Sequence, residues 1–355
     1  MSLLAAFLIV FGLSLSLSLL VTPLTIWLGR RTGAVDRAGG RRRGHEATSR
    51  LGGIAIFVSF TVAVIVAQFL PVPRFDPQEI VRFTGLVLGG VFIFSMGLLD
   101  DFMQFGPIPQ FISQIVAAGI AVAFLIFIQM VNNPLTGERL SWAGQHWVTV
   151  TVSLFWLGLM MNTVNFLDGL DGLASGVGLI AGLMLFVHSA FQLSPPQTSV
   201  SLLPLALVGA SLGFLLYNFH PARVFMGSSG SYFLGYVLGV LSIIGGAKMA
   251  TILLVMGLPL LDVAWLVVYR LAQGRNPMQG DRAHLHFRLV DMGIGQRRIV
   301  LAYYAFCGFF GVLTLVTASR LFKLFALLAM FALVGLGLLL LSRLERRTKP
   351  TSAEA

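Results

Sequence analysis

The chain opens with a long apolar run, Leu3–Leu28, which reads LLAAFLIVFGLSLSLSLLVTPLTIWL. A helix needs about twenty apolar residues to cross a hydrocarbon core of roughly 30 Å, and this run exceeds that length. The run is also too long for the core of a signal peptide, and it lacks a basic start and an evident small-residue cleavage site. We therefore interpret it as a retained transmembrane helix.

The rest of the chain has the same apolar character. Of its 355 residues, 57% are hydrophobic and only 11% are charged, and the mean hydropathy is +0.88. Soluble domains carry about a quarter charged residues, so lipid is the expected solvent for most of the surface. We predict an all-α integral membrane protein whose single transmembrane domain, 1–342, precedes a polar tail, 343–355. About eleven transmembrane helices are expected, at 3–29, 51–70, 83–99, 108–130, 146–161, 174–192, 200–217, 231–247, 249–269, 299–318 and 321–342.

The basic residues predict how the chain is oriented. Lys and Arg concentrate in cytoplasmic loops of membrane proteins. Eighteen of the 24 basic residues lie in the segment 30–50, at Arg223, in the segment 270–298 or in the tail. Eleven crossings place all of these on one side. The N-terminus is then outside and the C-terminus is in the cytoplasm, and the expected location is the inner (cytoplasmic) membrane.

The net charge of +10 and the isoelectric point near 10.6 require a separate explanation. No zinc-finger spacing, basic helix or RNA-binding motif is present, so we expect no nucleic-acid partner. We attribute the arginines instead to contacts with anionic lipid or anionic substrates. A single cysteine, Cys307, excludes disulfides within the chain and cysteine metal sites.

The first of four polar motifs is the pair Asp100-Asp101, at the end of the third apolar stretch. Adjacent carboxylates repel each other, and a divalent cation such as Mg²⁺ relieves that repulsion while it shares oxygen ligands with phosphates. A solvated helix end is the alternative explanation for the pair.

The second motif is Asn162–Leu173, which contains two pairs of polar residues spaced three apart. On a helical turn each pair shares one face. The amide and carboxylate groups could hold a nucleotide base, a ribose or a metal, and a polar turn between helices is the alternative. The polar residues of this motif are Asn162, Asn165, Asp168 and Asp171.

The third and fourth motifs suit anions. Residues 218–231 end in Gly227–Ser231 at the start of a predicted helix, where N–H groups are free to bind phosphate. Serine capping of the helix is the alternative. Residues 281–289 combine two histidines with arginines, which suits phosphate binding; a basic interfacial loop is the alternative, and zinc lacks a third nearby ligand.

Two ionisable residues lie inside apolar stretches. We interpret His188 as a packing residue. Asp262, in the sequence Gly-Leu-Pro-Leu-Leu-Asp, is either a functional group, as ionisable residues within membranes usually are, or an internal hydrogen-bond anchor.

Taken in order, the motifs resemble those of the polyprenyl-phosphate N-acetylhexosamine-1-phosphate transferases. The stretch Arg50–Gly53 and Pro259 with Asp262 also fit that family. The single leucine between His284 and His286 is similar to the branch that uses simple UDP-N-acetylhexosamines. The branch that uses UDP-N-acetylmuramoyl-pentapeptide typically has three consecutive histidines.

The chain departs from the family pattern at two positions. Ser228 stands where the family usually has an aspartate that is taken as a Mg²⁺ ligand, and Phe287 stands where the simple-sugar branch often has a further histidine. The first departure raises the alternative of an inactive homologue.

The resemblance implies an enzyme that transfers N-acetylhexosamine 1-phosphate from a UDP-sugar, with UDP-N-acetylglucosamine favoured, to polyprenyl (undecaprenyl) phosphate. UMP is released, and lipid-linked synthesis of a cell-envelope glycan begins. The expected cofactor is Mg²⁺, with Mn²⁺ as a substitute, and the expected partners are both substrates, membrane lipid and, as an open alternative, a second copy of the chain. The pentapeptide-sugar transferase is the rival enzyme. A transporter is disfavoured because the polar groups lie at loop ends on one face rather than near the bilayer midplane.

The resemblance and the residues together give an expected active site on the cytoplasmic face. Its catalytic residues are Asp100, Asp101, Asp168 and Asp171, of which Asp100, Asp101 and Asp171 are the metal ligands. Its substrate-binding residues are Arg50, Asn162, Asn165, Asn218, Phe225, Gly227, Ser228, Ser229, Gly230, Ser231, His284, His286 and Arg288.

Overall fold

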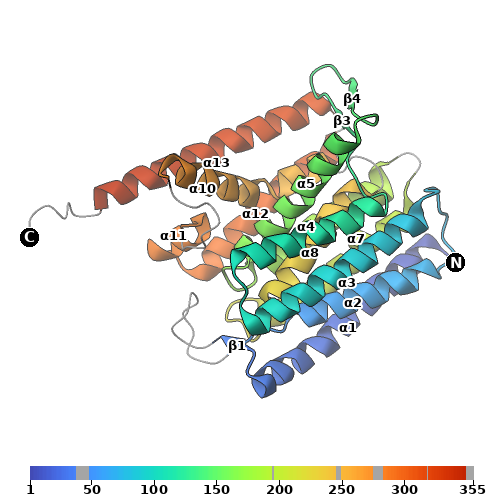
Figure 1. Cartoon of the computed structure of the whole chain (residues 1–355), viewed down its shortest axis with the longest axis horizontal. Coiled ribbons are helices and arrows are strands. Elements are labelled where there is room, and N and C mark those ends of the chain that lie inside the picture. Colours follow the sequence, from blue (N-terminus) through green and yellow to red (C-terminus); the bar gives the residue numbers. More distant parts are fainter. Residues whose placement is uncertain (37–47, 194–195, 245–248, 275–282, 318, 349–355) are drawn as a thin grey trace, which may run out of the picture.

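The computed structural model describes residues 1–36, 48–193, 196–244, 249–274, 283–317 and 319–348, and shows a bundle of long helices that run roughly along one direction (Figure 1). Residues 37–47 of the first basic loop, Asp281 and Arg282 of the fourth motif and residues 349–355 of the predicted tail lie outside that description. The elements are α1 (Leu3–Thr32), β1 (Val35–Asp36), β2 (Thr48–Ser49), α2 (Gly53–Gln68), α3 (Glu79–Met103), α4 (Pro107–Ala123), β3 (Met130–Asn132), β4 (Arg139–Ser141), α5 (His146–Leu167), α6 (Leu173–Val187), the π-helical turn η1 (His188–Gln192), α7 (Thr198–Asn218), α8 (Gly227–Ile243), α9 (Met249–Val255), α10 (Gly257–Ala272), α11 (Leu285–Asp291), α12 (Gln296–Val316) and α13 (Arg320–Thr348).

Each of the eleven predicted apolar stretches contains at least one helix in the part of the chain that is described. Seven described helices are long and apolar enough to cross a membrane, or eight if the bent pair α9 and α10 forms one span. The prediction of a multi-pass, almost entirely helical membrane protein is confirmed. The count of eleven crossings and the orientation stay predictions. Helix α13 continues to Thr348, into the segment predicted as a polar tail.

The predicted stretch 108–130 is too long. Helix α4 ends at Ala123, and Leu125 has a positive φ of 61° that turns the chain away from the helix axis. Arg82 Nε donates to the Leu125 carbonyl (3.2 Å) and holds this turn. A hairpin of β3 and β4 follows, so two small antiparallel sheets, β1 with β2 and β3 with β4, accompany the helices that the sequence predicted.

The predicted span 249–269 is broken into two helices, because α9 and α10 meet at an angle of 75°. The break falls at Met256, between Val255 and Gly257. Gly257 lets Met330 of α13 approach so closely that a Cβ there would lie 2.0 Å from the Met330 Cε atom. Pro259 cannot donate a backbone hydrogen bond in the first turn of α10. The bend makes α10 a separate element that carries Asp262.

Helix α8 lies at the centre of the bundle, buried along almost its whole length against α2, α3 and α5. Small residues permit the close approach of these helices. A Cβ at Gly235 would lie 2.6 Å from the Met161 Cα atom of α5. On α3, Gly89 makes room for Tyr236, whose hydroxyl donates to the Gly85 carbonyl at 2.8 Å. The start of α8 is therefore held in a fixed position relative to the ends of α3 and α5.

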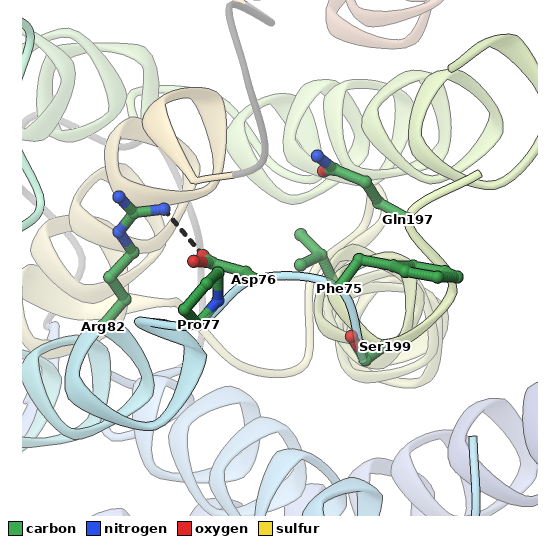
Figure 2. A pocket seen from close by; sticks show the side chains of 7 residues that line it. Phe75, Asp76, Pro77, Arg82, Gln197 and Ser199 are labelled. Carbon is green, nitrogen blue, oxygen red and sulfur yellow. Dashed lines mark hydrogen bonds and ion pairs between the residues drawn. The ribbon is translucent and has the colours of Figure 1, made fainter. Parts of the chain in front are cut away.

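The two ends of the bundle differ. The N-terminus and the β3–β4 hairpin lie at one end, whereas β1, α11 and the C-terminal end of α13 lie at the other (Figure 1). At the end of α3 that is far from Asp100, a cavity of about 250 Å³ contains the ion pair of Arg82 with Asp76, 2.6 Å (Figure 2). Arg82 and Asp100 are separated by about 27 Å of helix, at 1.5 Å per residue, so the cavity is remote from the polar motifs. The residues that line it are Phe75, Asp76, Pro77, Arg82, Gln197, Ser199 and Val200.

Beside this cavity, the buried carboxylate of Glu79 stabilises the end of the bundle. It forms an ion pair with Arg74 and accepts a hydrogen bond from Ser199 Oγ (2.8 Å) of α7. Glu79→Gln is expected to lower the free energy of unfolding by about 2–3 kcal/mol, because Arg74 loses its charged partner in a largely buried setting. Thermal unfolding in detergent measures the effect, with the exposed Glu138→Gln as the control. Equal melting temperatures for the two variants would show that the pair is not stabilising.

Candidate active site

The carboxylate of Asp101, at the end of α3, binds the start of α8. It accepts hydrogen bonds from Ser228 N (2.6 Å), Ser229 N (3.1 Å) and Ser229 Oγ (2.6 Å), and the residue is only 7% exposed. Asp101 thus caps α8 from a position more than a hundred residues earlier in the chain. The sequence predicted that these N–H groups would be free for phosphate; in the structure they are bound to Asp101.

Asp100 is equally buried, with 5% of its surface exposed. Its Oδ1 atom accepts from Phe105 N (2.7 Å), and Gln110 Nε2 lies 3.1 Å and 3.2 Å from its two oxygens. Among the described residues, neither Asp100 nor Asp101 forms an ion pair with a basic side chain. Two adjacent buried carboxylates without a positive partner are the setting in which a divalent cation binds most favourably.

The stretch Ser49–Gly53 lies directly against Val224–Gly227. Ser49 and Val224 form a parallel β-bridge. Phe225 N donates to the Ser49 carbonyl (2.8 Å), and Gly52 N donates back to the Phe225 carbonyl (3.0 Å). The resemblance had grouped the Arg50–Gly53 stretch with the third motif, and the structure brings the two together as neighbouring backbone segments.

Gly227 occupies the narrowest point between these segments. Its φ is +72°, and a Cβ there would lie 2.3 Å from the Arg50 carbonyl oxygen and 2.7 Å from both carboxylate oxygens of Asp101. Only glycine fits this position. The Arg50 guanidinium pairs with Asp36 at 2.8 Å, so a phosphate would compete with Asp36 for it.

The two asparagines of the second motif lie on helix α5, which runs to Leu167, beyond the end of the predicted stretch 146–161. Asn162 Nδ2 donates to Gln114 Oε1 of α4 at 2.5 Å. Asn165 Nδ2 donates to Ser231 Oγ of α8 at 2.9 Å. The two asparagines therefore join α5 to α4 and to α8, close to the start of α8.

The aspartates of the second motif do not share a helical face, and that prediction is wrong. Asp168 ends α5 and Asp171 lies in the following turn, which Gly172 closes with a φ of +81° before α6 begins. Asp171 Oδ2 is 2.8 Å from His220 Nδ1 and accepts a hydrogen bond from Ala222 N at 3.2 Å. The turn thus contacts the third motif through Asp171.

Asn218 is buried, and its amide is occupied by protein groups. Its Oδ1 atom accepts from Gly172 N (3.1 Å) and Ser175 Oγ (2.8 Å), and its Nδ2 atom donates to the Val224 carbonyl (2.8 Å). Both acceptor sites of the amide oxygen are filled. This placement favours a structural role, as a connector between the second and third motifs, over the substrate contact predicted for Asn218.

Both histidines of the fourth motif are buried, in contrast to a basic loop at the surface. His284 Nδ1 is 2.9 Å from Asp262 Oδ2, and the imidazole stacks on Phe166 with 5.0 Å between ring centroids. His286 packs on the turn of the second motif, where a Cβ on Gly169 would lie 2.3 Å from the imidazole Nε2. Four motifs and the Arg50–Gly53 stretch therefore meet at one end of the bundle.

Several residues of this region were missed or undervalued in the sequence. Gln110 and Gln114 of α4 bind Asp100 and Asn162, and Tyr304 OH donates to the Gly172 carbonyl at 2.5 Å. A glutamine within an apolar stretch is the only signal that could have indicated either of the first two, and Tyr304 has none. His220 was part of the third motif but was assigned no role.

The metal prediction can be compared with the donor groups present. Among the described residues, no three His, Cys, Asp or Glu side chains form a group that could hold a metal ion. The set Asp100, Asp101 and Asp171 is therefore not gathered into a cage of protein ligands. Mg²⁺ does not require one, because it is commonly held by one or two carboxylates together with substrate phosphates and water. Asp100 and Asp101 fit this mode.

Comparisons with known proteins agree with the motifs. The family model described as "Glycosyl transferase family 4" matches residues 83–246. "Decaprenyl-phosphate N-acetylglucosaminephosphotransferase" of Mycolicibacterium smegmatis is 35% identical over 79% of this chain and 74% of its own. "Probable undecaprenyl-phosphate N-acetylglucosaminyl 1-phosphate transferase" of Bacillus subtilis is 30% identical over 83% of this chain and 80% of its own. "Phospho-N-acetylmuramoyl-pentapeptide-transferase" of Moorella thermoacetica is 30% identical over 80% and 89%. The chain belongs to the family of polyprenyl-phosphate N-acetylhexosamine-1-phosphate transferases, and it is a sugar-phosphate transferase of the membrane.

Proposed function

We propose that the protein transfers N-acetylglucosamine 1-phosphate from UDP-N-acetylglucosamine to a membrane polyprenyl phosphate, such as undecaprenyl phosphate, and releases UMP. The observation that carries the proposal is the buried pair Asp100 and Asp101, without a positive partner among the described residues and joined to the start of α8. The names of the relatives in Mycolicibacterium smegmatis and Bacillus subtilis support the sugar and the lipid. The product would begin a lipid-linked glycan of the cell envelope.

The chemistry requires positioning and charge neutralisation. An oxygen of the polyprenyl phosphate attacks the β-phosphorus of the UDP-sugar, the anhydride bond between the two phosphorus atoms of UDP breaks, and UMP leaves. The attacking phosphate monoester has a second pKa near 6, so it is already ionised at neutral pH and needs no strong base. In-line alignment and stabilisation of the phosphate oxygens therefore supply most of the catalysis.

Each part of the site has a role in this proposal. Asp100 and Asp101 would hold Mg²⁺ or Mn²⁺, which when bound neutralises the charge of the diphosphate. Asp168 and Asp171 would line the nucleotide side of the site, and Asp171 would also fix His220. The groups proposed to bind phosphate oxygens are Arg50, Ser228, His284, His286 and Arg288. Membrane lipid and, as an assembly, a homodimer belong to the same proposal.

The pentapeptide-sugar transferase is the second candidate, and one relative at 30% identity carries that name. The sequence His284-Leu285-His286 favours the simple-sugar branch. The structure gives this spacing a physical meaning, because His284 binds Asp262 whereas His286 contacts the turn at Gly169.

A reconstituted assay tests the proposed function. Purified protein in lipid nanodiscs is mixed with undecaprenyl phosphate, Mg²⁺ and each of several UDP-sugars, and UMP release is measured. We expect release with UDP-N-acetylglucosamine. We also expect labelled UMP to enter UDP-sugar when the lipid product is present, because one phosphoanhydride replaces another and the equilibrium constant lies near unity. Release only with UDP-N-acetylmuramoyl-pentapeptide would favour the rival enzyme, and no release with any donor would contradict both.

We further propose that the motif end of the bundle faces the cytoplasm. The expectation is that a cysteine introduced at the exposed Gln78 is labelled in intact cells by a membrane-impermeant maleimide, whereas one at Arg343 is labelled only after permeabilisation. The native Cys307 is fully buried, so it adds little background. External labelling at both positions would overturn the eleven-span count, and external labelling at Arg343 but not at Gln78 would reverse the orientation.

Ser228 offers a test of the metal site. It follows Gly227 and its N–H binds Asp101, so Ser228→Asp adds a carboxylate next to the proposed cation. We expect the Mg²⁺ concentration for half-maximal rate to fall in this variant, because affinity for hard cations increases with ligand charge. Ser228→Ala should cost about 1–2 kcal/mol of transition-state stabilisation, the value of one hydrogen bond to a charged group.

A Mg²⁺ titration of UMP release measures this requirement. Ser228→Asn is the matched control, since it has the size of aspartate without the charge. An unchanged Mg²⁺ requirement in Ser228→Asp would show that the position does not face the cation. An inactive parent protein together with an active Ser228→Asp variant would instead favour the inactive-homologue alternative.

A further inference from the structure

We propose that Asp262 is a positioning residue for His284: it fixes the tautomer and orientation of the imidazole so that Nε2 is presented to a phosphate group of the substrates. This inference rests on the proposed function. It assigns a specific task to the aspartate of α10, for which the sequence left two interpretations open.

The first observation is a double contact. Asp262 Oδ2 is 2.9 Å from His284 Nδ1, and Asp262 Oδ1 accepts a hydrogen bond from Leu285 N, also at 2.9 Å. Asp262 is 4% exposed and His284 is 5% exposed. One carboxylate therefore holds both the side chain of His284 and the backbone of the next residue, at the point where α11 begins.

The second point concerns which nitrogen of the His284 imidazole carries the proton. An ionised carboxylate only accepts hydrogen bonds, so we assign the donor role to the His284 nitrogen that faces Asp262 Oδ2. His284 therefore carries its proton on Nδ1, and Nε2 is the nitrogen that remains for a ligand. An outer carboxylate partner of this kind fixes the orientation of a histidine ring, as it does for histidines that bind metals. When Nε2 carries a second proton, the imidazolium donates from Nδ1 to Asp262 and from Nε2 to an anionic oxygen of a substrate.

The third observation is that two aromatic rings hold the His284 imidazole in its orientation. Phe166 stacks on the His284 ring with centroids 5.0 Å apart and an interplanar angle of 29°. His286 stacks on it at 5.7 Å and 11°. Phe166 belongs to the second motif and directly precedes the end of α5 at Leu167. The His284 ring is thus held between Phe166 of the second motif and His286 of the fourth motif. It therefore lies among the residues of the proposed active site.

Replacement of Asp262 by asparagine removes one of the two acceptors and keeps the volume. The amide NH₂ must then face either Leu285 N–H or His284 Nδ1. In the second case Nδ1 must accept a hydrogen bond, so the imidazole can no longer carry protons on both nitrogens and loses the positive charge that it offers to a phosphate. We expect kcat to fall about 10- to 100-fold, the range seen when an outer partner of a functional histidine is removed. KM for the UDP-sugar should change less than about threefold if the loss is in orientation rather than in binding.

A double-mutant cycle separates positioning from simple stabilisation. We measure kcat for the wild type, Asp262→Asn, His284→Gln and the double variant in nanodiscs, with the exposed Glu138→Gln as the control. If Asp262 acts through His284, the double variant should be as slow as His284→Gln alone. Losses that multiply would overturn the proposal, because they would show that Asp262 acts independently of His284.

A second measurement does not depend on activity. Nitrogen-15 NMR of protein labelled at histidine reports which ring nitrogen carries the proton, and the His284 signals are those missing in His284→Gln. We expect a protonated Nδ1 in the wild type and loss of that exclusive form in Asp262→Leu, which has no acceptor. A wild-type His284 with the proton only on Nε2, or the same tautomer in Asp262→Leu, would overturn the proposal. If the protein releases no UMP at all, the proposed function fails, and this spectrum still tests whether Asp262 sets the tautomer.

Discussion

Asp101→Asn is expected to reduce kcat by about 10³-fold, equivalent to about 4 kcal/mol of transition-state stabilisation. Two effects combine. The variant loses one of the two buried negative charges that would bind the cation. Its amide NH₂ also faces Ser229 N and Ser229 Oγ, which are donors in the wild type, so the cap of α8 is weakened. UMP release at saturating substrate measures the rate, and thermal unfolding measures the weakened cap.

Asp100→Asn is the natural comparison. Asp100 Oδ1 accepts from Phe105 N, and an asparagine oxygen can keep this bond. The NH₂ then takes the position of Oδ2, where it meets Gln110 Nε2 at 3.2 Å, so this variant loses the charge with a weaker clash of donors. We expect a comparable loss of rate with a smaller loss of stability. Near-normal turnover in both variants would remove the pair from the active site. Loss of stability without loss of rate in Asp101→Asn would mean that Asp101 only caps α8.

Gly227→Ala is expected to abolish measurable turnover, at least about 10³-fold below the wild type. The added methyl group would overlap the Arg50 carbonyl and both carboxylate oxygens of Asp101. The positive φ of Gly227 adds strain of about 1 kcal/mol for any other residue. Relief of the overlap requires movement of Asp101, which three hydrogen bonds hold in place.

Gly119→Ala on α4 is the matched control, because no atom lies within 4 Å of the position of its added Cβ. We expect this variant to turn over at the wild-type rate. Size-exclusion chromatography shows whether each protein is folded before UMP release is compared. A folded and fully active Gly227→Ala protein would contradict the geometry of the Asp101 contact.

Local sequence patterns were sufficient to place most of the helices and to select polar residues that the structure brings together. Length and hydropathy located the apolar stretches, and polar motifs at their ends indicated residues that the structure brings to one end of the bundle. The patterns did not locate helix ends that are set by contacts with distant parts of the chain. Residues 124–130 are as apolar as α4, yet they leave the helix because Leu125 adopts a positive φ and Arg82 binds its carbonyl.

The partners of the site residues were the part that the sequence could not predict. Ser228 and Ser229 have free N–H groups when α8 is considered alone, and only the fold brings Asp101 to them. Asparagine is a residue type that often binds ligands, yet the amide of Asn218 connects the second and third motifs. Contacts between residues this far apart in the chain cannot be read from the spacing of apolar residues. That spacing shows which face of a helix is buried, but it does not show which other helix packs against that face.

The central position of α8 has a consequence for how the protein is made. Helices α2, α3 and α5, against which α8 packs, are all synthesised before it. Until α8 enters the membrane, Gly53 and Gly97 face the space that its first turn will occupy, and Asp101 has nothing to cap. The earlier helices must therefore remain separable in the lipid while the ribosome adds about a hundred and forty residues beyond Asp101, at roughly 5–20 residues per second. A nascent chain halted before Gly227 therefore has the first two polar motifs but lacks the helix against which α2, α3 and α5 pack.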